Sequence, residues 1–277
     1  MAREKRFSKK EWSWIMYDWA NSVYATNIMA AIYPTIFAST IPGGDIRWGY
    51  GTSIATFIVA ILAPFLGAVA DYKGMKKKLF TLFALLGIVF TPLMAALGNW
   101  KLCLVGYVVS RIGFSGSCLF YDSFLTDVTT DERMDAVSSS GYAWGYIGST
   151  VPFIICLVLI MGGPALGVPT MLATRLSFVI TGAWWLIFTL PLIRTYKQKY
   201  GRERGPQDTI GHIVGGVFSE VGHTMREIAH NKTVLVYMIA FFFYIDGVHT
   251  IIAMSTSYGT DLGISSTNLV LALLVTQ

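Results

Sequence analysis

Ionisable side chains lie inside long apolar stretches of this sequence, among them Asp18, Arg111, Asp122, Asp246 and His249. A charge within a membrane span costs at least about 2.5 kcal/mol, so such groups face a cavity or a partner. A carboxylate in a cavity can bind a proton or an amine. A guanidinium stays charged at any working pH and suits an anionic group such as a carboxylate. These residue types therefore indicate a polar site for a small solute.

Several of these residues also have a structural interpretation. Asp18 lies near the start of its stretch among tryptophans, so an interfacial anchor is the alternative to a cavity-lining carboxylate. Arg111 and Asp122 share a helical face, but they lie about 16 Å apart along it, too far to pair directly. Arg111 can instead bond helix carbonyls. Histidine is the residue type most often used as a proton carrier, so proton coupling through His249 competes with a hydrogen-bonded core role.

A polar spacing recurs in two of the stretches. Asp18 is followed at three, four and seven residues by Asn21, Ser22 and Ala25. Asp246 is followed at the same distances by His249, Thr250 and Ala253. These offsets place the polar groups on one stripe of a helix in both cases. A parallel six-plus-six repeat makes the first and seventh spans equivalent. The candidate solute-binding or ion-binding residues are Asp18, Asn21, Arg111, Asp122, Asp246 and His249.

The composition indicates the elements that position these residues. Of the 277 residues 54% are hydrophobic and 13% are charged, which excludes an ordinary soluble domain. A bilayer core needs about 20 apolar residues of helix, because lipid offers the backbone no hydrogen-bond partners. Eight such spans are predicted, at 12–38, 49–70, 79–98, 101–126, 139–161, 173–194, 233–257 and from about 267 onward. The last is cut short, which predicts a fragment of a longer protein.

The formal net charge of +5 lies in the gaps between the predicted spans. Lysines and arginines concentrate in the N-terminal tail and in the loops after the second and sixth spans. All three segments fall on one side, and the positive-inside rule makes that side cytoplasmic. We therefore expect the inner (cytoplasmic) membrane of a prokaryote, with the lipid bilayer and not nucleic acid as the partner. A charged loop after the fourth span, 127–135, is typical of a solvated face.

Other chemistry finds little support in the residues. Cys103, Cys118 and Cys156 fall inside predicted spans without C-x-x-C spacing, as small core residues do. The sequence lacks a phosphate-binding glycine loop, a nucleophile triad and a metal-spaced cluster. We therefore expect no cofactor, no metal site and no enzymatic activity.

The connection between the sixth and seventh spans divides the chain. Residues 1–200 form a predicted six-helix half, 201–232 a cytoplasmic linker, and 233–277 the start of a second half. Apolar residues three or four apart within 210–228 predict an amphipathic helix. It lies either along the membrane surface or against the underside of the bundle.

A motif follows the second predicted span. Its members Gly67, Asp71, Lys73, Gly74, Lys76 and Lys77 fit G-x-x-x-D-x-[KR]-G-x-K. Gly67 suits close helix packing, Asp71 ends the helix and Gly74 makes a tight turn. The motif resembles the G-x-x-x-D-[RK]-x-G-[RK]-[RK] signature of the major facilitator superfamily, with Tyr72 and Met75 departing from it. The resemblance implies an all-α bundle of about twelve spans and a cytoplasmic gate at the motif.

Two further stretches resemble one subfamily. The segment 17–22, YDWANS, is similar to the opening of unknown major facilitator family 1, which includes the fungal autophagy-related vacuolar amino-acid effluxers. The segment 138–148, SSSGYAWGYIG, is similar to its S-x-x-G-[WY]-A-x-G-Y-x-G stretch. The resemblance implies a transported amino acid.

The sequence thus predicts an alternating-access carrier for a small polar solute, with proton coupling left open. Two alternatives belong to other classes. One is a membrane scaffold or sensor derived from a transporter fold, and the other is a lipid-acting membrane enzyme. Polar residues at midplane depth favour the carrier, whereas catalytic groups gathered at one interface would favour the enzyme.

Overall fold

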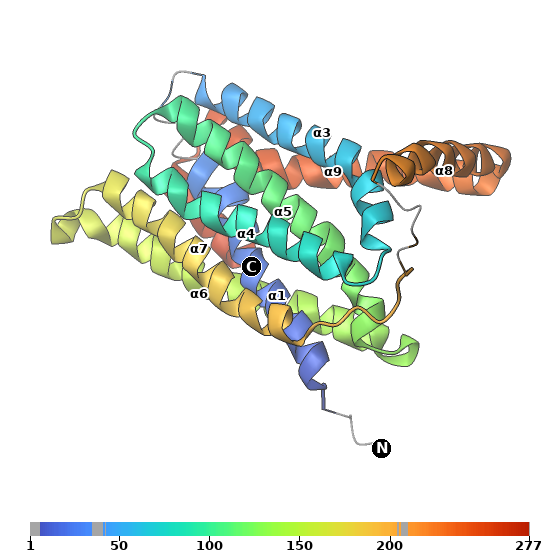
Figure 1. The fold of residues 1–277 in the computed structure, drawn as a ribbon. Coiled ribbons are helices and arrows are strands. Elements are labelled where there is room, and N and C mark those ends of the chain that lie inside the picture. Colours follow the sequence, from blue (N-terminus) through green and yellow to red (C-terminus); the bar gives the residue numbers. More distant parts are fainter. Residues whose placement is uncertain (1–5, 35–40, 42, 204, 206–209, 277) are drawn as a thin grey trace, which may run out of the picture.

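The computed structural model describes residues 6–34, 41, 43–203, 205 and 210–276 and is a bundle of long helices (Figure 1). The helices are α1 (Lys9–Val23), the π-helix η1 (Tyr24–Ala31), α3 (Gly44–Ala70), α4 (Met75–Ala96), α5 (Trp100–Val128), the 3-10 helix η2 (Asp131–Arg133), α6 (Met134–Gly162), the 3-10 helix η3 (Gly163–Leu166), α7 (Thr170–Thr195), α8 (Ile210–His230), α9 (Lys232–Asp261) and α10 (Ser266–Thr276). The described residues form no β-strand beyond one isolated bridge between Tyr72 and Arg202. The predicted all-α class is confirmed.

Length and apolarity identify the membrane-crossing helices. Within the described ranges six segments are long and apolar enough to cross a bilayer: Gly44–Ala70, Met75–Ala96, Trp100–Val128, Asp131–Leu166, Thr170–Thr195 and Lys232–Ile252. Large apolar side chains such as Phe57, Leu82 and Val158 are more than half exposed, as expected of surfaces that face lipid. The protein is therefore a multi-pass membrane protein.

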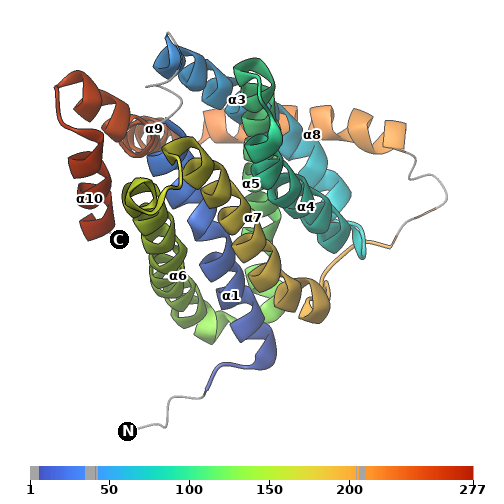
Figure 2. The ribbon, with the colours of Figure 1, turned by 90° about the vertical axis from the view of Figure 1, so that its left-hand side faces the viewer.

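The first predicted span differs from the other long helices. It comprises α1 and η1 and is not among the six segments, and its predicted end at 35–38 lies outside the described residues. It is instead enclosed by its neighbours, since Tyr17, Ala20 and Val23 are completely buried. It packs against α6 and α7, and its continuation η1 contacts α9 (Figure 2).

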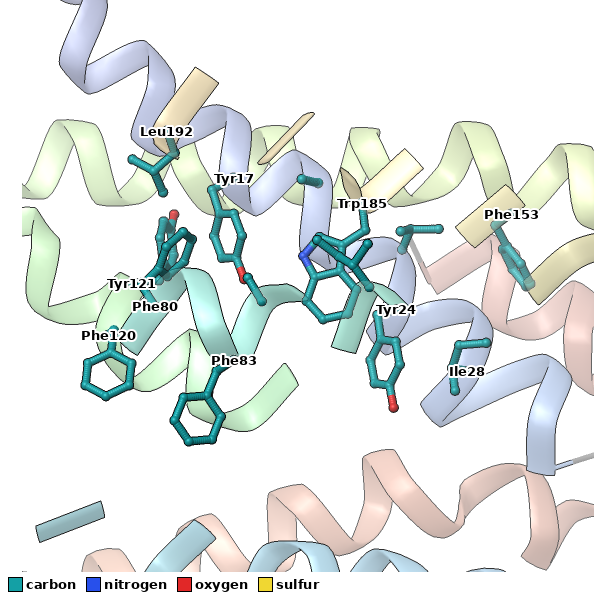
Figure 3. Packing of buried hydrophobic residues seen from close by; sticks show 14 of the residues in the cluster. Tyr17, Tyr24, Ile28, Phe80, Phe83, Phe120, Tyr121, Phe153, Trp185 and Leu192 are labelled. Atoms are coloured by element: carbon teal, nitrogen blue, oxygen red, sulfur yellow. The ribbon is translucent and has the colours of Figure 1, made fainter. Parts of the chain in front are cut away.

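Aromatic side chains fill the core between α1, α4, α5 and α7. Figure 3 shows Trp185 of α7 between Tyr17 and Tyr24, with 5.4 Å between the rings of Trp185 and Tyr24. Glycines allow α4 and α5 to cross at backbone contact, since a Cβ on Gly113 would lie only 2.3 Å from the amide nitrogen of Gly87. This core holds the first helix firmly in the bundle.

The π-helix was not predicted from the sequence. In η1 the Ile32 amide donates to the Asn27 carbonyl five residues back. The Asn27 side chain is fully buried and donates to Thr181 Oγ1 at 2.9 Å and to Cys156 Sγ at 3.5 Å. Contacts with α6 and α7 therefore bind the widened turn on both sides, which a local sequence pattern does not reveal.

Six helix termini meet at one end of the bundle, called here the basic end. The helices α1, α4 and α6 begin there, and α3, α5 and α7 end there. Contacts between these termini prove the arrangement, since Glu11 of α1 pairs with Arg133 and Lys76 of α4 pairs with Asp127 of α5. The alternation of basic and non-basic loops predicted from the sequence is thus present in the structure.

The predicted amphipathic helix is α8. It packs on the last turns of α3, where Val217 is buried and the rings of Phe65 and Phe218 lie 5.1 Å apart. From there it extends beyond the end of α3 (Figure 1). Phe218 and Met225 stay more than 60% exposed, so the contact with the bundle uses only part of the apolar face.

Candidate functional site

A cavity of about 660 Å³ lies between α1, η1 and α6 on one side and α9 and α10 on the other. Figure 2 shows α10 beside α6, and α9 beside η1, the continuation of α1. The lining residues are Asp18, Ser22, Ala25, Thr26, Ala30, Tyr142, Tyr146, Ser149, Ile251, Ile252, Ser255, Leu269, Ala272, Leu273 and Thr276. Hydroxyl groups and aliphatic side chains dominate the wall, and Asp18 is its charged member.

The two family-like stretches meet at Asp18. A Cβ on Gly141 of α6 would lie 3.3 Å from Asp18 Oδ2, and a Cβ on Gly145 would lie 3.2 Å from Asp18 Cγ. Gly148 faces Trp19 in the same way, with 2.6 Å to the ring. The segments 17–22 and 138–148 therefore form one interface, in which the glycines of α6 leave room for the polar residues of α1.

Asp122 and Asn21 lie close to Asp18. Asp122 of α5 is within electrostatic reach of Asp18, and both carboxylates are within reach of Cys118. Asn21 is buried and its Nδ2 donates to Cys118 Sγ at 3.6 Å. Three of the predicted site residues are therefore gathered around one point between α1 and α5, and Asp18 connects that point to the cavity.

Arg111 of α5 is also within electrostatic reach of Cys118, but its guanidinium is directed elsewhere. Its guanidinium contacts Met29 Sδ and lies 5.7 Å from the ring of Phe114. Its Nε is buried without a hydrogen-bond partner among the described residues. Arg111 is not one of the cavity-lining residues. Its predicted role as an anchor for a carboxylate remains a prediction.

Asp246 and His249, which the predicted repeat matches to Asp18 and Asn21, are not part of this cavity. Asp246 and His249 are exposed on α9 and are absent from the lining, which receives Ile251, Ile252 and Ser255 from that helix. The structure therefore places Asp18 at the cavity without bringing Asp246 or His249 to it.

The predicted gate motif forms the turn between α3 and α4 at the basic end. Asp71 ends α3, where its amide donates to the Gly67 carbonyl at 3.1 Å. Gly74 has φ +78°, a left-handed conformation that favours glycine, so the predicted tight turn is confirmed. A Cβ on Gly67 would meet nothing within 4 Å among the described residues, so the close helix packing expected at Gly67 stays a prediction. Lys77 is half-buried at the start of α4.

A segment after α7, residues 196–203, is bound to this turn and is called here the strap. The Arg202 amide donates to the Asp71 carbonyl at 2.7 Å, and the Lys73 amide donates to the Arg202 carbonyl at 3.0 Å. Gln198 Oε1 accepts from the Gly74 amide at 2.8 Å. Lys73 also pairs with Glu203 at 2.6 Å, although both side chains are exposed. The linker therefore begins as an ordered part of the first half.

Asp127, at the end of α5, fastens the strap. Its Oδ2 accepts from the Tyr196 hydroxyl at 2.6 Å, and its Oδ1 accepts from the amides of Lys199 at 2.9 Å and Tyr200 at 3.0 Å. Lys76 Nζ lies 3.6 Å from Oδ2, and the Asp127 side chain is 0% exposed. The prediction of a solvated charged loop is thus wrong for Asp127. A usable signal was present, because Asp127 continues the buried stripe of Phe120 and Phe124.

Glu11 is a second buried carboxylate at the basic end, just before the segment 12–38. It accepts from Arg133 Nε at 2.8 Å, from Thr129 Oγ1 at 2.7 Å and from the Ser8 amide at 2.6 Å. Burial raises the pKa of Glu11, but these hydrogen bonds outweigh it and lower the pKa to about 2. The capping-box spacing of Ser8 and Glu11 is the sequence signal for this contact.

Comparison with known proteins adds a separate line of evidence. The family model described as "Vacuole effluxer Atg22 like" matches residues 48–277. The "Uncharacterized MFS-type transporter YxiO" of Bacillus subtilis (strain 168) is 45% identical over 284 residues, which cover 99% of this chain and 65% of the relative. An "Uncharacterized protein" of Aquifex aeolicus (strain VF5) is 26% identical over 263 residues, 93% of this chain and 59% of the relative.

A fungal relative is more distant. "Autophagy-related protein 22-1" of Aspergillus niger is 23% identical over 290 residues, which cover 77% of this chain and 46% of the relative. The chain spans less than two thirds of the length of each of these three relatives.

Proposed function

The chain belongs to the vacuole effluxer Atg22-like family, and on this premise we propose that it is part of a secondary transporter that moves a small polar solute by alternating access. The observation that carries the proposal is the cavity at Asp18. It lies between α1 and α6 of one half and α9 and α10 of the other, where two rocking halves would alternately expose a solute.

The energetics of a charge in a membrane support this function. A carboxylate such as Asp18 is costly inside a span unless a wet cavity or a partner stabilises it. Asp18 borders a cavity with seven hydroxyl-bearing residues in its wall. A purely structural helix bundle gains nothing from such a wall, whereas a solute pathway requires it.

The location follows from the charges. The basic end carries the lysines and arginines of the N-terminal helix, the motif turn and the strap, and the positive-inside rule makes that end cytoplasmic. Similarity to a Bacillus protein favours the cytoplasmic membrane of a prokaryote. The turn and strap then form the cytoplasmic gate, and an amino acid is the solute that the resemblance of the segments 17–22 and 138–148 implies.

Counterflow in proteoliposomes tests the proposal. Proteoliposomes that contain the full-length protein and are preloaded with a panel of unlabelled amino acids and amines should accumulate at least one labelled member of the panel. Asp18→Asn should abolish accumulation, whereas Asp135→Asn, an exposed carboxylate at the start of α6, should leave it unchanged. Correct insertion without counterflow of any solute would refute transport and favour a membrane scaffold.

A further inference from the structure

We infer that Asp18 binds the cationic group of the solute, so that this half of the protein recognises an organic ammonium with an aliphatic body. The inference rests on the proposed function and deepens it. It assigns the ammonium end of the solute to one carboxylate and assigns no anion-binding role to the described cavity wall.

The chemistry of the cavity wall supplies the first argument. Asp18 is its charged residue, and no lysine, arginine or histidine is among the lining residues of the described chain. The remaining polar members are hydroxyls: Ser22, Thr26, Tyr142, Tyr146, Ser149, Ser255 and Thr276. Such a wall attracts a cation and disfavours an anion.

The ion pairs among the described residues supply the second argument. Among the described residues the ion pairs lie at the basic end and on α8, and none of them includes Asp18. A second carboxylate, Asp122, lies within electrostatic reach and strengthens the local negative field. Arg111 is directed toward Met29 and Phe114 instead. Since no described ion pair includes Asp18, its carboxylate is available to a cation that enters the cavity.

The position of Asp18 supplies the third argument. Gly141 and Gly145 of α6 lie close to its carboxylate, since a Cβ added to either glycine would lie within 3.3 Å of the carboxylate group. The carboxylate is thus held between α6 and the cavity. An ammonium in the cavity can make a short charge-assisted hydrogen bond to it.

The size and the opposite wall define the rest of the solute. A cavity of about 660 Å³ lies within the range of about 300–1,000 Å³ typical of small-molecule sites. The second half contributes Ile251, Ile252, Leu269 and Leu273 opposite the polar wall. An ammonium with an aliphatic group of a few carbons satisfies both walls.

Three probe molecules distinguish binding through the ammonium group from binding through the carboxylate group. Valinamide carries an ammonium without a carboxylate, N-acetylvaline carries a carboxylate without an ammonium, and valine carries both. Binding to the purified full-length protein is measured by calorimetry. We expect valinamide and valine to bind and N-acetylvaline to bind at least about tenfold more weakly, because it lacks the charge that pairs with Asp18.

Variants locate the binding group. Asp18→Asn should weaken valinamide binding by at least about tenfold, and Asp18→Glu should restore part of it. Asp135→Asn is the matched control and should change binding by less than about twofold. The comparison of the three probes on the wild-type protein needs no variant, so it stands even where Asp18→Asn fails to fold.

Several results would overturn the inference. These are equal binding of N-acetylvaline and valinamide, no binding of valinamide to the wild-type protein, or unchanged valinamide binding by folded Asp18→Asn. Counterflow of a solute without an ammonium would refute the cationic anchor and leave the transporter standing. Loss of all counterflow would refute both.

Discussion

Replacement of Asp127 should release the strap from the first half. Asp127→Ala leaves the Tyr196 hydroxyl, the Lys199 and Tyr200 amides and the Lys76 ammonium without their acceptor. Truncation of a buried charge typically costs about 3–5 kcal/mol, because its partners stay desolvated. The Asp127 side chain is 0% exposed and that of Lys76 is 14% exposed, so solvent recovers little of this loss. The expected cost is about 3–4 kcal/mol.

Asp127→Asn should cost less, for a reason visible in the geometry. The amide oxygen can keep the hydrogen bonds from Lys199 and Tyr200, and the amide nitrogen can donate to the Tyr196 hydroxyl, which both donates and accepts. The loss is then the charge opposite Lys76, at a separation of 3.6 Å. We expect about 1–2 kcal/mol for this variant.

Limited proteolysis measures the difference. Trypsin cleaves after Lys199 or Arg202 when the strap opens, and its rate follows the open population if closing is faster than cleavage. Since about 1.4 kcal/mol is a factor of ten, Asp127→Ala should be cut at least about a hundredfold faster and Asp127→Asn about tenfold faster. Asp135→Asn should match the wild type. Equal cleavage of Asp127→Ala and the control would refute the role of Asp127, and equal cleavage of the two Asp127 variants would refute the retained hydrogen bonds.

Two further substitutions test the contact between α1 and α6 at Gly145 and the buried Glu11 at the basic end. Gly145→Ala should destabilise the protein by about 1–3 kcal/mol and weaken valinamide binding, because the added Cβ would lie 2.8 Å from Ser22 Oγ. Gly162→Ala is the control and should do neither, because a Cβ there would meet nothing within 4 Å. Equal melting temperatures and equal valinamide affinities of the two variants would contradict the prediction. Glu11→Gln should destabilise the protein at pH 7, because the lowered pKa of Glu11 means that its ionised form stabilises the fold above about pH 4.5. That contribution is lost as the pH falls toward about 2, so the melting temperatures of variant and wild type should converge over this interval, and a constant difference would contradict the assignment.

The helices of this protein could be predicted from the sequence because their cause is local. Lipid leaves a run of apolar residues no option but the helix, and Gly74 produces a turn through its own backbone freedom. The ends of the helices were harder, since burial there depends on distant partners. Asp127 lies at the end of α5, where an acidic loop predicts solvent, yet the chain returns about 70 residues later to cover it.

The candidate site shows the same division. The stretches at 17–22 and 138–148 were both visible in the sequence, but their mutual contact was not, because more than a hundred residues separate them. The grouping of Asp18, Asn21 and Asp122 likewise depends on how α1 meets α5. Spacing within one helix could identify polar stripes, and only the packing of helices shows which stripe meets a cavity.

The π-helix has a mechanical consequence for the first helix. It follows α1 directly, so the residues before it, Asp18 among them, keep their orientation only while the wider turns persist. A π-turn accommodates one residue more than the i→i−4 turn. Removal of one such insertion would rotate everything on its N-terminal side by about 100° and advance it by about 1.5 Å. The direction in which Asp18 faces therefore depends on the π-helical turns of the segment 24–31 as well as on the packing of α1.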